Sequence, residues 1–248
     1  MDDPTPDLPA DPPRVFDSES EPPPFWSPWA TVGWGLAISL VFVIVQAVVV
    51  VVWGAVGAGR PSLDGDLIAT GTLASAVICS SLVVALSAAM RGSRPRQSLG
   101  LTPPSSGSLG RWLAITAGLI VTSDLLTVLL DRPVVPEFMS EIVRTSSATP
   151  LLAVAIIIAA PFFEELFVRG FLIEGLRRGR LGTIGAVAVT SLFWASIHVQ
   201  YGIYEIATIF VFGLVLGAAR IISGSLWVPV GMHTLANLVA TAEAVIAG

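Results

Sequence analysis

The chain has no lysine, a single cysteine and few charged residues of any kind. Only 12% of its 248 residues are charged, whereas 54% are hydrophobic. One thiol cannot form an intramolecular disulfide, so Cys79, which lies in an apolar stretch, is predicted to be a small buried side chain. The thirteen arginines are scattered at segment ends and the net charge is −5, which excludes a nucleic-acid-binding protein. The mean hydropathy of +0.81 is typical of a bundle of membrane-spanning helices.

Several motifs of known intramembrane and nucleotide chemistries are also missing. The sequence contains no HExxH of the zinc proteases, no GxGD-type aspartate pair and no glycine-flanked serine paired with a histidine. A glycine-rich phosphate loop is absent too. A catalytic site in this chain would have to be built from other residues.

Long apolar runs define the fold class, because a spanning helix needs about 20 mostly apolar residues. Seven such segments are predicted, at residues 29–57, 67–90, 111–130, 150–176, 181–198, 203–222 and 226–247. The fourth is over-long and contains Pro161, so residues 150–160 are expected to form a separate short or re-entrant helix. The prediction is an all-α, polytopic transmembrane bundle of seven to eight helices with a polar site inside the membrane.

The first 28 residues differ from the rest, since they hold nine of the eighteen prolines and seven of the eighteen acidic residues. Such a stretch cannot bury enough apolar surface to offset its chain entropy and is predicted to be a disordered tail ahead of a transmembrane domain at 29–248. Arginines of the loop 90–112 and of residues 177–180 are expected on the cytoplasmic side. This places the N-terminus in the cytoplasm, and we expect a multi-pass protein of a bacterial plasma membrane.

Ionisable residues interrupt the apolar segments of the second half. Glu164, Glu165 and Arg169 lie in the fourth segment, where Glu165 and Arg169 share a helix face at i,i+4 and can form an ion pair. Glu164 is turned about 100° away and stays available as a general base acting on water. Intramembrane charges are costly, so they indicate a functional site.

Two further segments carry the only histidines of the chain. His198 ends the fifth segment, and His233 stands four residues before Asn237, so one helix face presents an imidazole and an amide that can donate to an oxyanion. On a strict count of seven spans the two histidines would lie at opposite depths, unless a fifth helix continued through residues 201–206. Asp124 has no assignable role. Gly213 and Gly217, at four-residue spacing, predict a close helix approach.

Together, EELFVR at 164–169, the histidine that ends LFWASIH at 192–198 and HTLAN at 233–237 resemble the three motifs of the CAAX-protease and bacteriocin-processing (Abi) intramembrane proteases. The resemblance covers about residues 150–240. One position departs from it: the motif FxxxH would have Phe at position 194, where this chain has Trp194.

The resemblance implies a membrane endopeptidase that hydrolyses peptide bonds of membrane-associated or prenylated peptides within the lipid bilayer. By position, Glu164 and His198 would activate the water, His233 and Asn237 would stabilise the oxyanion, and Glu165 and Arg169 would give structural support. Glu164, His198 and His233 could also bind Zn²⁺, with a fourth position open, or polarise water without metal. The oligomeric state is left open.

Two other function classes fit the same residues. A proton-coupled transporter would use the glutamates and histidines as an ion path. A non-catalytic membrane scaffold or immunity protein would use them only to lock the bundle.

Overall fold

The structure is a computed structural model that describes residues 25–57, 64–90, 94–105 and 107–247. Within these ranges all the regular secondary structure is helical, with no strand. The first 24 residues of the predicted disordered tail lie outside the described residues.

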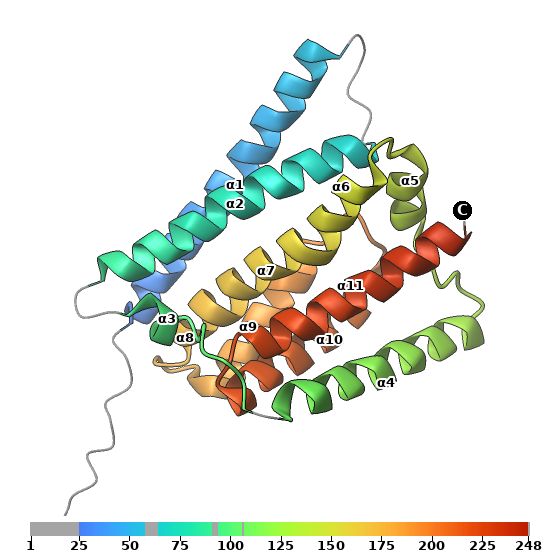
Figure 1. Cartoon of the computed structure of the whole chain (residues 1–248). Coiled ribbons are helices and arrows are strands. Elements are labelled where there is room, and N and C mark those ends of the chain that lie inside the picture. The colour runs from blue at the N-terminus through green and yellow to red at the C-terminus, as the bar shows by residue number, and fades with distance from the viewer. Residues whose placement is uncertain (1–24, 58–63, 91–93, 106, 248) are drawn as a thin grey trace, which may run out of the picture.

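The described helices run in chain order through the bundle shown in Figure 1. They are α1 (Pro28–Val56), α2 (Gly65–Ala89), α3 (Pro95–Ser98), α4 (Ser108–Leu129), α5 (Glu137–Thr145), α6 (Thr149–Ala153), η1 (Val154–Ala159), α7 (Ala160–Glu165), η2 (Leu166–Leu172), α8 (Ile173–Leu176), α9 (Gly182–Ser196), α10 (Ile203–Ser223) and α11 (Trp227–Ala247). The segments α6 to α8 form one helix, Thr149–Leu176.

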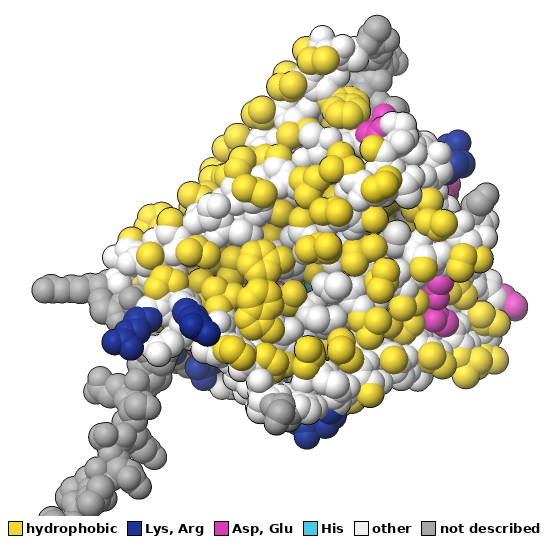
Figure 2. Space-filling model, viewed as in Figure 1, with side chains coloured by type: hydrophobic (Ala, Val, Ile, Leu, Met, Phe, Trp, Pro, Cys, Tyr) yellow, Lys and Arg dark blue, Asp and Glu magenta, His cyan; other side chains and the backbone are white. Residues whose placement is uncertain are grey.

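Six of the described helices are long and apolar enough to span a membrane: α1, α2, α4, Thr149–Leu176, α10 and α11. Figure 2 shows apolar side chains over most of one face of the bundle, with charged side chains mainly toward its edges. Because large apolar side chains such as Leu36, Val51 and Ile184 are exposed, this surface suits contact with lipid rather than water. The chain is a multi-pass integral membrane protein.

The predicted fifth span, 181–198, is shorter than expected. Its helix α9 covers 15 residues, and at 1.5 Å per residue that is about 22 Å, less than the hydrocarbon thickness. The helix does not continue through residues 201–206, because α10 starts only at Ile203. His198 therefore lies in the turn between the two helices, and this turn decides its position.

The predicted break at Pro161 is wrong. Helix Thr149–Leu176 passes through Pro161 without interruption, and the proline is the second residue of α7, directly after the π-helical turn η1. A proline lacks an N–H and its ring crowds the preceding turn. The wider π turn accommodates both effects, so the helix stays whole and carries the glutamates near its middle.

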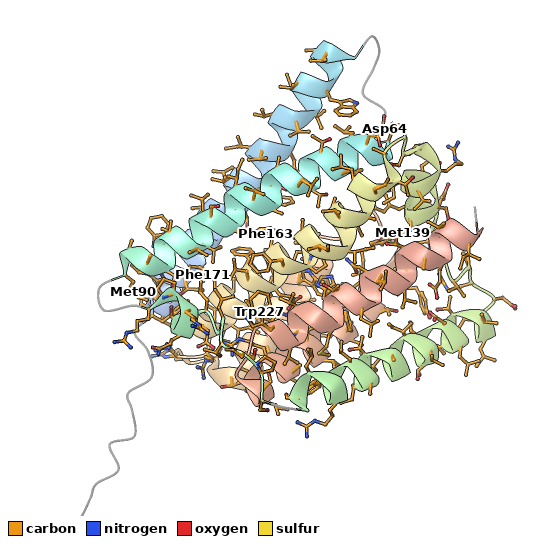
Figure 3. All side chains as sticks on the ribbon, in the orientation of Figure 1. Asp64, Met90, Met139, Phe163, Phe171 and Trp227 are labelled. Carbon is orange, nitrogen blue, oxygen red and sulfur yellow. The ribbon has the colours of Figure 1, made fainter. Side chains whose placement is uncertain are left out.

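Aromatic side chains pack this central helix against its neighbours. Phe163, Phe167 and Phe171 stack along one side, with ring centroids 5.8 and 6.5 Å apart, and Phe163 stacks on Phe42 of α1 at 5.7 Å. Phe163 and Phe171 can be followed along the helix in Figure 3. Cys79 is fully buried in the same core, as predicted.

The arginine-rich end of the bundle is held by ion pairs around Glu174. Its carboxylate accepts hydrogen bonds from Arg177 Nη2 at 2.8 Å and from Arg220 Nη2 at 2.9 Å. Glu174 is therefore buried in an ion-pair cluster. Gly100, at φ +73°, lies against the Arg220 guanidinium, where any Cβ would collide with it.

Glycines also bring α9 and α10 together as the GxxxG spacing predicts. A Cβ on Gly217 would come within 2.6 Å of Val187, and one on Gly213 within 3.1 Å of both Ser191 and Trp194. The absence of side chains at these two positions lets the α10 backbone lie directly against the residues of the site.

Candidate active site

The core of the site is a buried three-residue cluster. Glu165 Oε1 accepts hydrogen bonds from Arg169 Nη1 and from His233 Nδ1, each at 2.9 Å. The side chains of Glu165 and Arg169 are 0% exposed. The predicted i,i+4 ion pair is thus confirmed, and it also holds His233 of α11, a contact that the sequence did not reveal.

Arg169 links this cluster to two further elements. Its Nη2 donates to the Gly213 carbonyl of α10 at 3.1 Å, and its guanidinium lies 4.6 Å from the centroid of the Trp194 ring of α9. A buried cation needs such compensation, because an unpaired charge in the interior is very costly. Arg169 therefore ties the central helix to α9 and α10.

Glu164, the neighbouring carboxylate, points to a different partner. Its Oε2 accepts a hydrogen bond from Trp194 Nε1 at 2.6 Å. Glu164 is half-buried, in contrast to the fully buried Glu165. Of the two glutamates, Glu164 is the one that can be reached from outside the protein core.

The two histidines meet at Trp194, which resolves the apparent conflict in their depths. The rings of His198 and His233 lie with centroids 5.1 and 5.2 Å from that of Trp194, both nearly perpendicular to it. Because α9 ends at Ser196, His198 folds back into the bundle, and its Nδ1 contacts the Trp194 carbonyl at 2.7 Å.

The tautomers of both rings follow from these contacts. A carbonyl and a carboxylate can only accept, so Nδ1 carries a proton in His198 and in His233. In the neutral rings each Nε2 is then free to accept a proton. A protonated His233 can instead donate from Nε2, and the positive charge then faces Glu165.

Asn237 makes its contact with the backbone of the central helix. Its Nδ2 donates to the Ile156 carbonyl at 2.9 Å. That carbonyl lacks a helical donor, because Ala160 donates to Ala155 across the π turn and Pro161 has no N–H. One amide N–H of Asn237 is committed to this contact, and a second remains.

Trp194 is the site residue that the sequence did not identify. It appeared only as an aromatic in place of Phe, yet it contacts Glu164, Arg169 and both histidines. Tyr201 was missed as well. Its ring stacks on that of His198 at 6.2 Å, and burial together with the nearby Glu164 charge raises its pKa to about 12.

The predicted zinc ligands do not form a metal-binding group in this arrangement. In the part of the chain that the structure describes, no three His, Cys, Asp or Glu side chains are grouped so that they could hold a metal ion. Glu164, His198 and His233 have suitable donor atoms, but they gather around the Trp194 ring instead.

Fold and site together define a polytopic helical membrane protein with glutamate, histidine and asparagine side chains gathered inside the bundle. Residues 146–239 match the family described as "Type II CAAX prenyl endopeptidase Rce1-like". The match contains all three motifs and confirms the resemblance for this part of the chain.

Part of the chain is also similar to a curated bacterial protein. An Escherichia coli protein described as an "Uncharacterized 24.3 kDa protein" is 34% identical over 114 residues, which is 44% of this chain and 52% of that protein. The similarity thus spans about half the length of the relative. No solved structure gives a significant match.

Proposed function

We propose that the protein is an intramembrane endopeptidase in which Glu164 activates a water molecule. The observation that carries the proposal is the difference between the adjacent glutamates. Glu165 is fully buried in an ion pair, whereas Glu164 is half-buried and bonded to Trp194, whose ring contacts both histidines. The match to a family of membrane proteases over residues 146–239 supports it.

In the proposed reaction, Glu164 takes a proton from water as the water oxygen attacks the scissile carbonyl. In this proposal His198 accepts a hydrogen bond from the same water through its free Nε2. Protonated His233 donates from Nε2 to the oxyanion that develops on the carbonyl, joined by the second N–H of Asn237. When the tetrahedral intermediate collapses and its carbon–nitrogen bond breaks, the proton held by Glu164 passes to the leaving amine.

The substrate would be a peptide anchored at the membrane, prenylated or not. The exposed apolar surface of α1, α4 and α9 lets such a substrate approach through the lipid. The arginine-rich end of the bundle, including Arg94, Arg96 and Arg177, would face the cytoplasm of a bacterium.

The test is cleavage of a quenched peptide library, prenylated and unprenylated, by the purified protein in detergent. Glu164→Gln and Glu164→Ala are expected to remove cleavage while the protein stays folded. Glu243→Gln, which changes a half-buried carboxylate of α11, serves as the matched control and should retain activity. Equal cleavage by the wild type and both Glu164 variants would refute the assignment.

Metal dependence is a separate arm of the same assay. Because the predicted ligands are not grouped for a metal, we expect cleavage to survive thorough chelation. Loss of cleavage on chelation and its return with Zn²⁺ would contradict this and assign the metal to the reaction.

The two other function classes give different results. Ion flux that depends on Glu164, with no cleavage, would identify a transporter. If Glu164→Gln only lowers the stability of a protein that never cleaves, a scaffold is the better description.

A further inference from the structure

We infer that Trp194 is a positioning residue that fixes the Glu164 carboxylate and His198 relative to each other, a role that deepens the proposed function. Its indole N–H holds Glu164 Oε2 at 2.6 Å, and its main-chain carbonyl holds His198 Nδ1 at 2.7 Å. One residue thus orients both groups that would share the water.

The Glu164 contact is short and joins a neutral donor to an ionisable acceptor. Hydrogen bonds with one charged partner are shorter and roughly twice as strong as neutral ones. The bond occupies one carboxylate oxygen and leaves the other free for the water. Without the indole N–H, the Glu164 side chain could rotate about its own bonds.

Rigid packing supports the indole in this position. The ring is 2% exposed and lies between the Arg169 guanidinium, at 4.6 Å, and the two imidazole rings. Gly213 of α10 allows this packing, since a Cβ there would stand 3.1 Å from the ring. The indole cannot shift without moving residues on three other elements.

A role as simple core filling does not account for the hydrogen bond. Two other tryptophans, Trp26 and Trp112, have buried indole nitrogens with no hydrogen-bond partner, so this fold tolerates such an indole. The indole N–H of Trp194 does have a partner, Glu164, and phenylalanine would fill most of the same volume without making that bond.

The first measurement does not depend on activity. Indole nitrogens labelled with ¹⁵N give one N–H signal for each of the seven tryptophans, and Trp194→Phe identifies the signal of Trp194 by its loss. We expect this signal far downfield in the wild type, and upfield of that position in Glu164→Gln, whose neutral amide accepts a weaker hydrogen bond. A signal that Glu164→Gln leaves in place overturns the inference.

The second measurement separates positioning from binding. Trp194→Phe keeps the ring and the main-chain carbonyl but loses the donor, so kcat should fall about tenfold or more through misplacement of Glu164, with KM unchanged. Trp112→Phe removes a buried indole whose N–H is unpartnered and should leave both constants unchanged. Full kcat in a folded Trp194→Phe protein overturns the positioning role.

The indole signal and the kinetic constants distinguish failure of this inference from failure of the proposed function. If the wild type cleaves no peptide, the proposed function fails and the catalytic part of the role fails with it. The indole signal still decides whether Trp194 holds Glu164, because it reports the contact directly.

Discussion

Replacing Arg169 by methionine tests the buried ion pair at the centre of the site. The substitution removes two hydrogen bonds, to Glu165 at 2.9 Å and to the Gly213 carbonyl at 3.1 Å. It also leaves the Glu165 carboxylate, which is 0% exposed, with His233 as its remaining partner. Breaking a buried pair by removing one partner costs about 3–5 kcal/mol, because the other charge stays in a medium of low dielectric.

The exposed pair Glu141–Arg144 in α5 is a matched control. Its Arg144 Nη2 to Glu141 distance is 2.7 Å, but the side chains are 70% and 47% exposed. Water screens such a pair, so Arg144→Met should cost at most about 0.5 kcal/mol. Equilibrium unfolding in mixed micelles of mild detergent and dodecyl sulfate measures both changes in the free energy of unfolding.

The double variant Glu165→Gln/Arg169→Met completes the experiment. Because it removes both charges, it should be more stable than Arg169→Met alone, with a coupling of about 1–3 kcal/mol. Equal costs for Arg169→Met and Arg144→Met, or a double variant whose two effects simply add, would refute the reasoning that desolvated charge compensation holds the site together.

Three further outcomes follow from individual contacts. Gly213→Ala should lower cleavage about tenfold by displacing Trp194, whereas Gly118→Ala, which meets no atom within 4 Å, should not change it. Ultraviolet titration of the two tyrosines should show one group titrating near pH 12 that disappears in Tyr201→Phe. Because the pKa of Tyr201 is higher in the folded than in the unfolded protein, the stability contributed by its neutral phenol is present below about pH 10 and is lost as the pH rises toward 12. Asn237→Ala should lower the free energy of unfolding by about 1–3 kcal/mol, because the Ile156 carbonyl loses its donor. An unchanged midpoint in the unfolding experiment would show that this carbonyl finds another partner.

Local spacing predicted the parts of the site that lie on one helix. The i,i+4 relation of Glu165 and Arg169 gave their ion pair directly, and the length of the apolar runs gave six of the spans. These features depend only on residues a few positions apart, so they can be read from a single sequence.

Contacts between helices could not be predicted in the same way. The Trp194–Glu164 bond joins residues 30 positions apart and the His233–Glu165 bond joins residues 68 apart. The first bond depends on how α9 packs against the central helix, and the second on how α11 packs against it. The break at Pro161 was predicted wrongly because a proline signals the loss of a hydrogen bond but not the π turn that absorbs it.

The two π turns set the rotational phase of the segment between them. Each holds about one residue more than an α turn. Every residue beyond it therefore lies about 100° from the direction that it would have in an unbroken α-helix of the same sequence. Since η1 and η2 flank Ala160–Glu165, the phase of both glutamates differs from that of the flanking turns. Deleting one residue from Val154–Ala159 would return that turn to an ordinary helix still long enough to cross the bilayer. Because this deletion removes the extra residue that the wide turn accommodates, the carboxylates would still face α9 and α11, so the chain can change length at a π turn without dismantling the site.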